Sequence, residues 1–284
     1  MKKGINTLII LSILIITFSC ENDETILPVA DFTADKTTIT LDQLVNFTDL
    51  SLNNPTKWTW GFSDNTSGWH QQNPSHKFDK IGVYTISLTV ENNDGTDRIE
   101  KKNYITVTPE VSILTDTRDN KTYKTVKIGE QWWMAENLNY AAEESYYYNN
   151  NEKNAAIFGR LYNWPTANEV CPDGWHLPSY EEYNILLDFA KPNPEKKLIA
   201  VSDLWDDMHS EITNSYEFSA LPGGQSVQGT SYDYIGFNAM FWTSSITEEF
   251  NPICHIMQCY SGSSFHSVAY QGRTTYFSVR CIKD

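Results

Sequence analysis

The most restrictive feature of this chain is the stretch GVYTISLTVENNDG at residues 82–95. From Tyr84 to Val90 apolar residues occupy every second position, and threonine or serine fills the positions between them. This alternation is typical of a strand with one buried face, and NNDG supplies a hairpin turn after it. Because no helical period of useful length interrupts residues 27–108, we expect a β-sandwich there.

An aromatic strand upstream strengthens this prediction. KWTWGF alternates again, with Trp58, Trp60 and Phe62 on one face. Together, WTWGFSDNTSG and NPSHKFDKIGVYTISLTVENNDG resemble the polycystic-kidney-disease (PKD) domain, an immunoglobulin-like, all-β sandwich. The resemblance implies a spacer or adhesive module without catalysis over residues 27–108.

The first residues predict export. Lys2 and Lys3 precede an apolar run, residues 9–18, that is shorter than the ~20 residues needed to span a bilayer. Ser19-Cys20 then resembles the lipobox of bacterial lipoproteins, in which the signal peptide, here residues 1–19, is removed before a lipidated cysteine. The alternative is an ordinary signal peptide with a different cleavage site.

The lipobox resemblance implies a location. Cys20 is the predicted lipidation site, and residues 20–26 form an acidic tether in which CENDE resembles the surface-export signal of Bacteroidota lipoproteins. We therefore expect an outer-membrane protein, lipid-anchored and exposed at the cell surface, that touches the membrane only through the lipid.

The net charge of the chain and its lack of common catalytic motifs exclude several classes of partner and function. The formal net charge of −15 repels nucleic acid and anionic membrane surfaces, so neither is an expected partner. The sequence contains none of the common metalloprotease, serine-hydrolase, phosphate-loop or dinucleotide motifs. We expect no catalysis and no cofactor.

A second domain is expected over residues 115–284. Pro109 and a polar run mark residues 109–114 as a linker. The segments after it, among them DTRDNKTYKTVKIGEQWWMAENLNY, GRLYNWPTAN, CPDGWHLPSYEEYNILLDFA and FSVRCIKD, follow one another as in the Fibrobacter succinogenes major paralogous domain, which they closely resemble. That family consists of surface lipoprotein modules of poorly defined role.

Local patterns in this domain predict both helix and strand. Ser179 is an N-cap candidate, with Glu182 placed to complete a capping box before an amphipathic helix. A hairpin is expected around Gly129-Glu130, and TTYFSVRCIK is expected to be a closing strand. These elements give an α+β domain and resemble the C-type-lectin-like fold.

Four cysteines follow the predicted anchor. Outside the cytoplasm an even number favours two disulfides, and four cysteines allow three pairings. The lectin-like resemblance implies one pair, Cys171 with Cys281. Cys254 and Cys259 are five residues apart and would lie about 16 Å apart in an extended strand, too far for a disulfide without a turn or bulge.

A catalytic alternative rests on these two cysteines. CHIMQCY resembles a motif of formylglycine-generating enzymes, a family with a lectin-like fold. The resemblance implies that Cys254 and Cys259 bind Cu(I) in a copper-dependent oxidase. Asn251 stands where that family has a serine. We therefore expect no metal, with copper as the alternative.

Two predicted loops have an amino-acid composition that suits ligand binding. ESYYYNNNEKN and GGQSVQGTSYDYIGF combine tyrosines with amides and glycines, a composition suited to gripping sugar rings or another protein. The candidate ligand-binding residues are Tyr146, Tyr147, Tyr148, Tyr232 and Tyr234, and the alternative is that these rings cover the domain's own core. We predict a binding or adhesion protein for an extracellular polysaccharide or protein. A structural subunit of a surface assembly is the third possibility.

Overall fold

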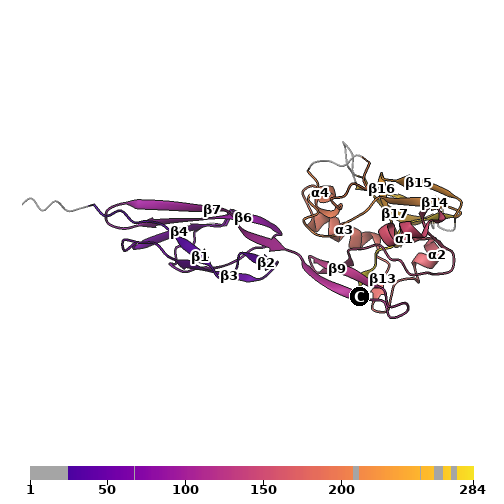
Figure 1. Cartoon of the computed structure of the whole chain (residues 1–284), viewed down its shortest axis with the longest axis horizontal. Helices are drawn as coiled ribbons and strands as arrows, with labels where there is room; N and C mark the ends of the chain where they lie inside the picture. The colour runs from indigo at the N-terminus through magenta and orange to yellow at the C-terminus, as the bar shows by residue number, and fades with distance from the viewer. Residues whose placement is uncertain (1–24, 67, 207–210, 250, 259–264, 270–273) are drawn as a thin grey trace, which may run out of the picture.

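The computed structural model describes residues 1–284 except 1–24, 67, 207–210, 250, 259–264 and 270–273. Two bodies follow one another along the long axis, a β-sandwich and then a mixed domain (Figure 1). The predicted signal peptide and Cys20 lie outside the described residues. Within the described part of the chain, no helix is long and apolar enough to cross a membrane.

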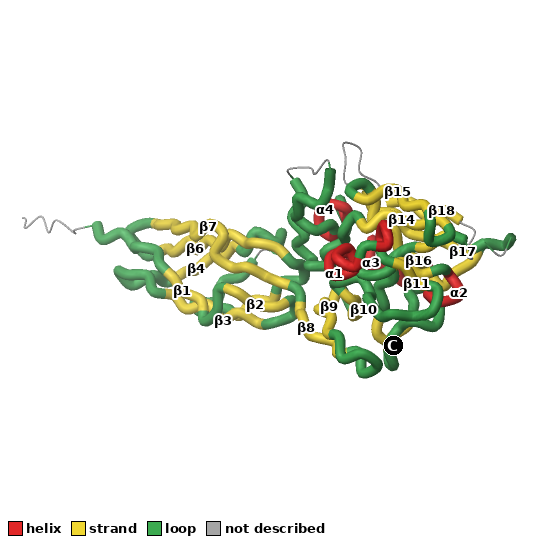
Figure 2. Tube along the Cα trace, turned by 45° about the vertical axis from the view of Figure 1, so that its right-hand side comes forward, coloured by secondary structure: helices red, strands yellow, loops and turns green. Residues whose placement is uncertain are grey.

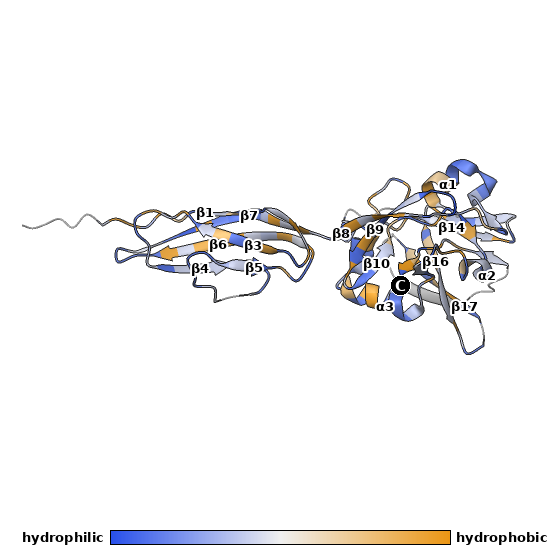
Figure 3. Ribbon diagram, turned by 90° about the horizontal axis from the view of Figure 1, so that it is seen from below, coloured by the Kyte–Doolittle hydropathy of each residue, from blue (hydrophilic) through white to orange (hydrophobic). Residues whose placement is uncertain are grey.

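The N-terminal domain is all-β, as expected. One sheet has the order β1 (Phe32–Ala34), β3 (Leu44–Asp49), β5 (Ser75–Lys77), and the other has the order β2 (Thr38–Thr40), β7 (Thr96–Thr108), β6 (Gly82–Glu91), β4 (Lys57–Gly61). In Figure 3 these strands carry orange hydrophobic segments between blue hydrophilic ones. The predicted alternation in β6 is confirmed, because Tyr84, Ile86, Leu88 and Val90 are all buried in the core between the sheets.

One strand pair in the sandwich is parallel. β2 lies beside the end of β7, with Thr38 opposite Thr106 and Thr40 opposite Thr108. β7 also pairs with β6, in the antiparallel sense. An early strand of the domain is thus hydrogen-bonded to its last strand.

The expected linker is instead a strand. Residues Glu110–Thr115 form β8, which pairs along its whole length with β9 (Thr122–Ile128), so that Pro109 alone separates β7 from β8. Proline is tolerated between two strands because it removes a single backbone donor. Figure 2 shows β8 between the sandwich and β9. Ile81 of the sandwich also packs against the core of the C-terminal domain, so the two domains are in direct contact.

The C-terminal domain combines short sheets with helices. Its five-stranded sheet has the order β13 (Trp175–His176), β20 (Ile282–Lys283), β10 (Gln131–Met134), β9, β8. The smaller sheets are β11 (Ser145–Tyr146) with β12 (Leu161–Tyr162), β15 (Ser231–Ile235) with β14 (Gly223–Val227) and β19 (Thr275–Tyr276), and β16 (Asn238–Ile246) with β17 (Pro252–Gln258) and β18 (Phe265–Ala269). The helices are η1 (Tyr148–Asn150), α1 (Glu152–Phe158), α2 (Trp164–Ala167), α3 (Tyr180–Phe189) and α4 (Pro194–Leu198).

Two local predictions are confirmed. The Ser179 side chain accepts a hydrogen bond from the backbone of Glu182, and the Glu182 carboxylate accepts one from the backbone of Ser179. This capping box starts α3 at the expected residue. The β9–β10 hairpin turns at Gly129, whose φ of 61° lies in the left-handed region that glycine adopts without strain.

The expected closing strand is divided. Residues 275–276 pair with β14, whereas residues 282–283 pair with β10 and β13. The segment between them makes isolated bridges to Tyr162 and Phe241. All residues from 275 to 282 are buried, because the segment passes between sheets and is covered on both sides. The alternation of residue types in this segment therefore does not correspond to a strand with one buried and one exposed face.

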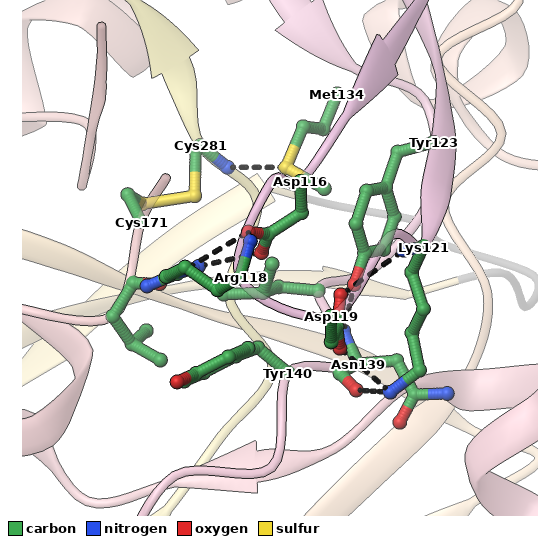
Figure 4. Close-up of polar contacts among 12 residues, drawn as sticks. Asp116, Arg118, Asp119, Lys121, Tyr123, Met134, Asn139, Tyr140, Cys171 and Cys281 are labelled. Atoms are coloured by element: carbon green, nitrogen blue, oxygen red, sulfur yellow. Dashed lines mark hydrogen bonds and ion pairs between the residues drawn. A yellow bond between two sulfur atoms is a disulfide. The ribbon is translucent and has the colours of Figure 1, made fainter. Parts of the chain in front are cut away.

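A disulfide fixes this segment to the middle of the domain. Cys171 and Cys281 are bonded at an S–S distance of 2.05 Å, the pair that the lectin-like resemblance implied. The backbone N–H of Cys281 also donates to the sulfur of Met134 (Figure 4). The bond closes a loop with a sequence separation of 110 residues.

A histidine joins β13, α3 and the last residue of the chain. Nδ1 of His176 lies 2.6 Å from an Asp284 carboxylate oxygen, and Nε2 lies 3.0 Å from a Glu182 oxygen. Partial burial opposes protonation, but the hydrogen bonds to Asp284 and Glu182 outweigh it and raise the pKa of His176. Burial is likewise outweighed at Glu182, where hydrogen bonds from Ser179 and His176 lower the pKa.

These pKa shifts predict a pH-dependent contribution to stability. The raised pKa of His176 stabilises the fold below the unfolded pKa of about 6.5, and this contribution is lost as pH rises through the folded value. His176→Gln should therefore lower the free energy of unfolding more at pH 5.5 than at pH 8.5. Because the ring is partly exposed, the difference should stay below about 1 kcal/mol. Urea unfolding at both pH values measures it, with His70→Gln in the sandwich as the control. Equal losses at both pH values would contradict the assignment.

Candidate functional site

A hollow of about 650 Å³ opens beside the turn that connects β8 to β9. It is lined by side chains from that turn, from β9, from the segment after β10, from α1 and from the buried Arg280. We call it the amide pocket after the three asparagines in its lining, Asn120, Asn137 and Asn139. An aliphatic wall completes it, formed by Ala155, Ala156, Ile157, Ala200 and Leu221.

The turn at the edge of the pocket is held by a buried carboxylate. Asp116 has no exposed surface and accepts two hydrogen bonds from the Arg118 guanidinium, at 2.9 and 2.6 Å (Figure 4). These hydrogen bonds from Arg118 lower the pKa of Asp116. Arg118 also donates to the carbonyl of Val170, next to Cys171, and stacks over the ring of Tyr140. The turn is thus fixed to the disulfide-bearing loop on one side and faces the amide pocket on the other.

The three asparagines differ in what they can offer a ligand. The Asn137 amide is buried, donates to Phe158 O and Ser278 Oγ, and accepts from Arg280. Its hydrogen-bonding groups are therefore used within the protein and are not available to a ligand. Across the described residues, neither the Asn120 nor the Asn139 carboxamide forms a hydrogen bond within the protein. Their donors and acceptors remain available at the surface of the pocket.

The cations that line the pocket have acceptors within the protein. Lys121 contacts Asp119 at 3.1 Å and donates to the carbonyl of Asn139, whereas Lys124 pairs with Glu217 at 2.6 Å. Glu136 accepts from the backbone N–H of Lys124. These contacts hold both lysine side chains along the pocket lining.

Arg280 forms the base of the pocket and is only 1% exposed. Its guanidinium donates to the backbone carbonyls of Phe218 and Ser219, and the rings of Phe218 and Phe241 lie 4.4 and 5.2 Å from it. Burial lowers the pKa of Arg280 to about 9, so the group remains charged at neutral pH. Its acceptors are neutral, and it joins the β10 segment to residues 218–219.

The predicted tyrosine loops lie at a different place in the domain. The structure does bring them together, because η1 packs against the β14–β15 hairpin and the Tyr232 hydroxyl donates to Asn150 Oδ1. Tyr148 is 5% exposed and packs against Tyr232, so its ring is unavailable to a ligand, contrary to the prediction. Tyr146 packs on Tyr276 and Tyr147 on Arg160, which leaves Tyr234, at 51% exposure, as the open ring of the predicted set.

The copper alternative involves Cys254 and Cys259. Cys254 lies in β17, is fully buried and donates to the carbonyl of His255. Burial raises the pKa of its thiol well above the ordinary value, which disfavours the thiolate that Cu(I) requires. Among the described residues, no group of three His, Cys, Asp or Glu side chains could hold a metal ion. Cys259, the second residue of the copper alternative, lies outside the described residues, and the copper alternative stays a prediction.

Comparison with known proteins gives two family matches. The model of the PKD domain matches residues 26–107, and the model of the Fibrobacter succinogenes major domain matches residues 126–283. No curated protein matches the chain.

Two solved structures show a weaker similarity. A solution NMR structure of a protein from Methanosarcina mazei is 27% identical, with 36% of this chain and 63% of that chain covered and a TM-score of 0.24. A structure of promiscuous carbohydrate-binding modules from the β-sandwich superfamily is 10% identical, with 92% and 93% covered and a TM-score of 0.29. The chain thus spans less than two thirds of the Methanosarcina mazei protein. With TM-scores this low, neither structure supports an argument about fold or function.

Proposed function

Because this chain belongs to the family of the Fibrobacter succinogenes major domain, preceded here by a PKD domain, we propose that it is a cell-surface binding protein for an extracellular polysaccharide. The C-terminal domain binds the polysaccharide in the amide pocket, and the PKD domain separates that pocket from the membrane. The protein has no catalytic role and needs no cofactor. It is attached to the outer membrane by a lipid on Cys20.

The observation that carries this proposal is the pair of available carboxamides beside an aliphatic wall. Sugar hydroxyls donate and accept hydrogen bonds, and the carboxamides of Asn120 and Asn139 do both. The aliphatic wall, which includes the exposed Ile157, suits the C–H face of a sugar ring. Convergent polar groups on an apolar background are the usual composition of a small-ligand site. We also propose that the C-terminal domain has the C-type-lectin-like fold expected from its sequence.

Binding should depend on the two available asparagines. The double variant Asn120→Gly/Asn139→Ala removes both carboxamides, and glycine at 120 retains the left-handed backbone (φ 60°) found there. Two lost hydrogen bonds of about 1 kcal/mol each should weaken polysaccharide binding at least about tenfold. Affinity electrophoresis against a panel of soluble polysaccharides measures this effect.

Tyr234→Ala serves as the matched surface control, because this tyrosine is exposed on β15 and does not line the pocket. Loss of binding in Tyr234→Ala with none in the double variant would move the site to the tyrosine loops. No binding to any polysaccharide, together with a stable complex with a protein, would instead favour the subunit of a surface assembly.

A further inference from the structure

The charged side chains of the amide pocket are unequally available to a ligand. Lys121 and Lys124 are each paired with a carboxylate, of Asp119 and Glu217 respectively. Arg280 forms no hydrogen bond to a carboxylate of any described residue, but it is buried and its guanidinium donates to Asn137 Oδ1 and two backbone carbonyls. The pocket therefore presents no exposed cation without a partner among the described residues.

The acidic side chain in the pocket lining, Glu136, is available to a ligand. Glu136 lines the pocket, is exposed, and forms no ion pair with any described residue; its contact is a hydrogen bond from the backbone N–H of Lys124. Lys121 and Lys124 are paired with Asp119 and Glu217, so Glu136 is the exposed charge of the lining that has no ion-pair partner among the described residues. The net charge of −15 on the whole chain adds to the negative potential.

We propose that the amide pocket selects neutral saccharides and rejects saccharides that carry a carboxylate, an inference that rests on the proposed polysaccharide-binding function. A carboxylate ligand would be placed beside Glu136, where like charges repel and the two lining lysines are already paired with carboxylates. A neutral sugar instead donates its hydroxyls to the Glu136 carboxylate. Such charge-assisted hydrogen bonds are stronger than those between neutral groups. Glu136 is thus the residue that determines specificity, and the amides of Asn120 and Asn139 complete the recognition.

The test compares each neutral polysaccharide that binds with its own carboxymethyl derivative. In about 20 mM salt we expect the derivative to bind at least about tenfold more weakly, and the difference should shrink as salt screens the repulsion. Glu136→Gln should weaken binding of the neutral polymer a few-fold and reduce the discrimination. Glu130→Gln, which removes the same charge at the exposed β9–β10 turn outside the pocket, should leave the discrimination unchanged.

Equal or tighter binding of the carboxymethyl derivative would overturn the inference and leave the proposed function intact. If Glu130→Gln and Glu136→Gln reduce the discrimination equally, the overall charge is responsible and Glu136 loses its assigned role. If neither form of any polysaccharide binds, the proposed function itself fails. The three results are distinguishable in one set of titrations.

Discussion

The double variant Cys171→Ala/Cys281→Ala is expected to lower the free energy of unfolding of the C-terminal domain by about 5 kcal/mol. The bond closes a loop with a sequence separation of 110, and in the chain-entropy model a loop of this size restricts the unfolded chain by that amount. Alanine is chosen because Cys281 is fully buried, where the hydroxyl of serine would need a partner. Urea unfolding of exported protein, followed by tryptophan fluorescence, measures the change.

Cys254→Ala is the control for this experiment, because it removes a buried cysteine that forms no disulfide with any described residue. Its cost should be limited to the small cavity left by one sulfur, about 1 kcal/mol. Wild-type protein unfolded in the presence of reductant should match the double variant. A double variant as stable as wild type would show that exported protein does not contain the bond.

The second large effect is expected at Arg280. Arg280→Met keeps much of the apolar volume but removes the guanidinium that bonds Asn137, Phe218 and Ser219. Two buried acceptors and one partly buried acceptor then lose their donor, and the free energy of unfolding should fall by about 3–5 kcal/mol. Urea unfolding of the C-terminal domain again provides the measurement.

Arg98→Met provides the matched control for the same chemical change. Arg98 lies on the sandwich and pairs with Glu100 at an exposed site, where loss of an ion pair changes stability by less than about 0.5 kcal/mol. A loss at Arg280 no larger than at Arg98 would mean that the buried guanidinium contributes nothing net, with its desolvation cancelling its hydrogen bonds.

The features predicted correctly are those specified by neighbours in the sequence. The alternation from Tyr84 to Val90 reflects one face of one strand, and the capping box of Ser179 and Glu182 spans three residues. Gly129 marks a hairpin because its own backbone needs a positive φ. Each signal is local, so the surrounding fold did not have to be known.

The features predicted incorrectly depend on contacts that a segment makes with other strands. Pro109 and its polar neighbours suggested a linker, although β8 finds its partner β9 after the turn at residues 116–121. The closing segment was expected to be one strand because its residues alternate. Its burial on both sides follows from sheets contributed by three other parts of the chain.

The candidate site was missed for a related reason. Asn120 and Asn139 are not among the predicted site residues, and nothing local distinguishes them from Asn137, which is buried. Composition pointed instead to the tyrosine loops, since tyrosines near amides suit binding. The structure uses most of those rings to pack the loops against each other.

The parallel pairing of β2 with β7 also determines how the sandwich carries tension. A pull that reaches β2 from its N-terminal end and β7 from its C-terminal end acts in opposite directions along one axis. The pairs at residues 38–40 and 106–108 then share the load at the same time, whereas an antiparallel pair pulled from one end would open one bond after another. Since Pro109 alone separates β7 from β8, a force on the C-terminal domain enters the sandwich along the strand axis.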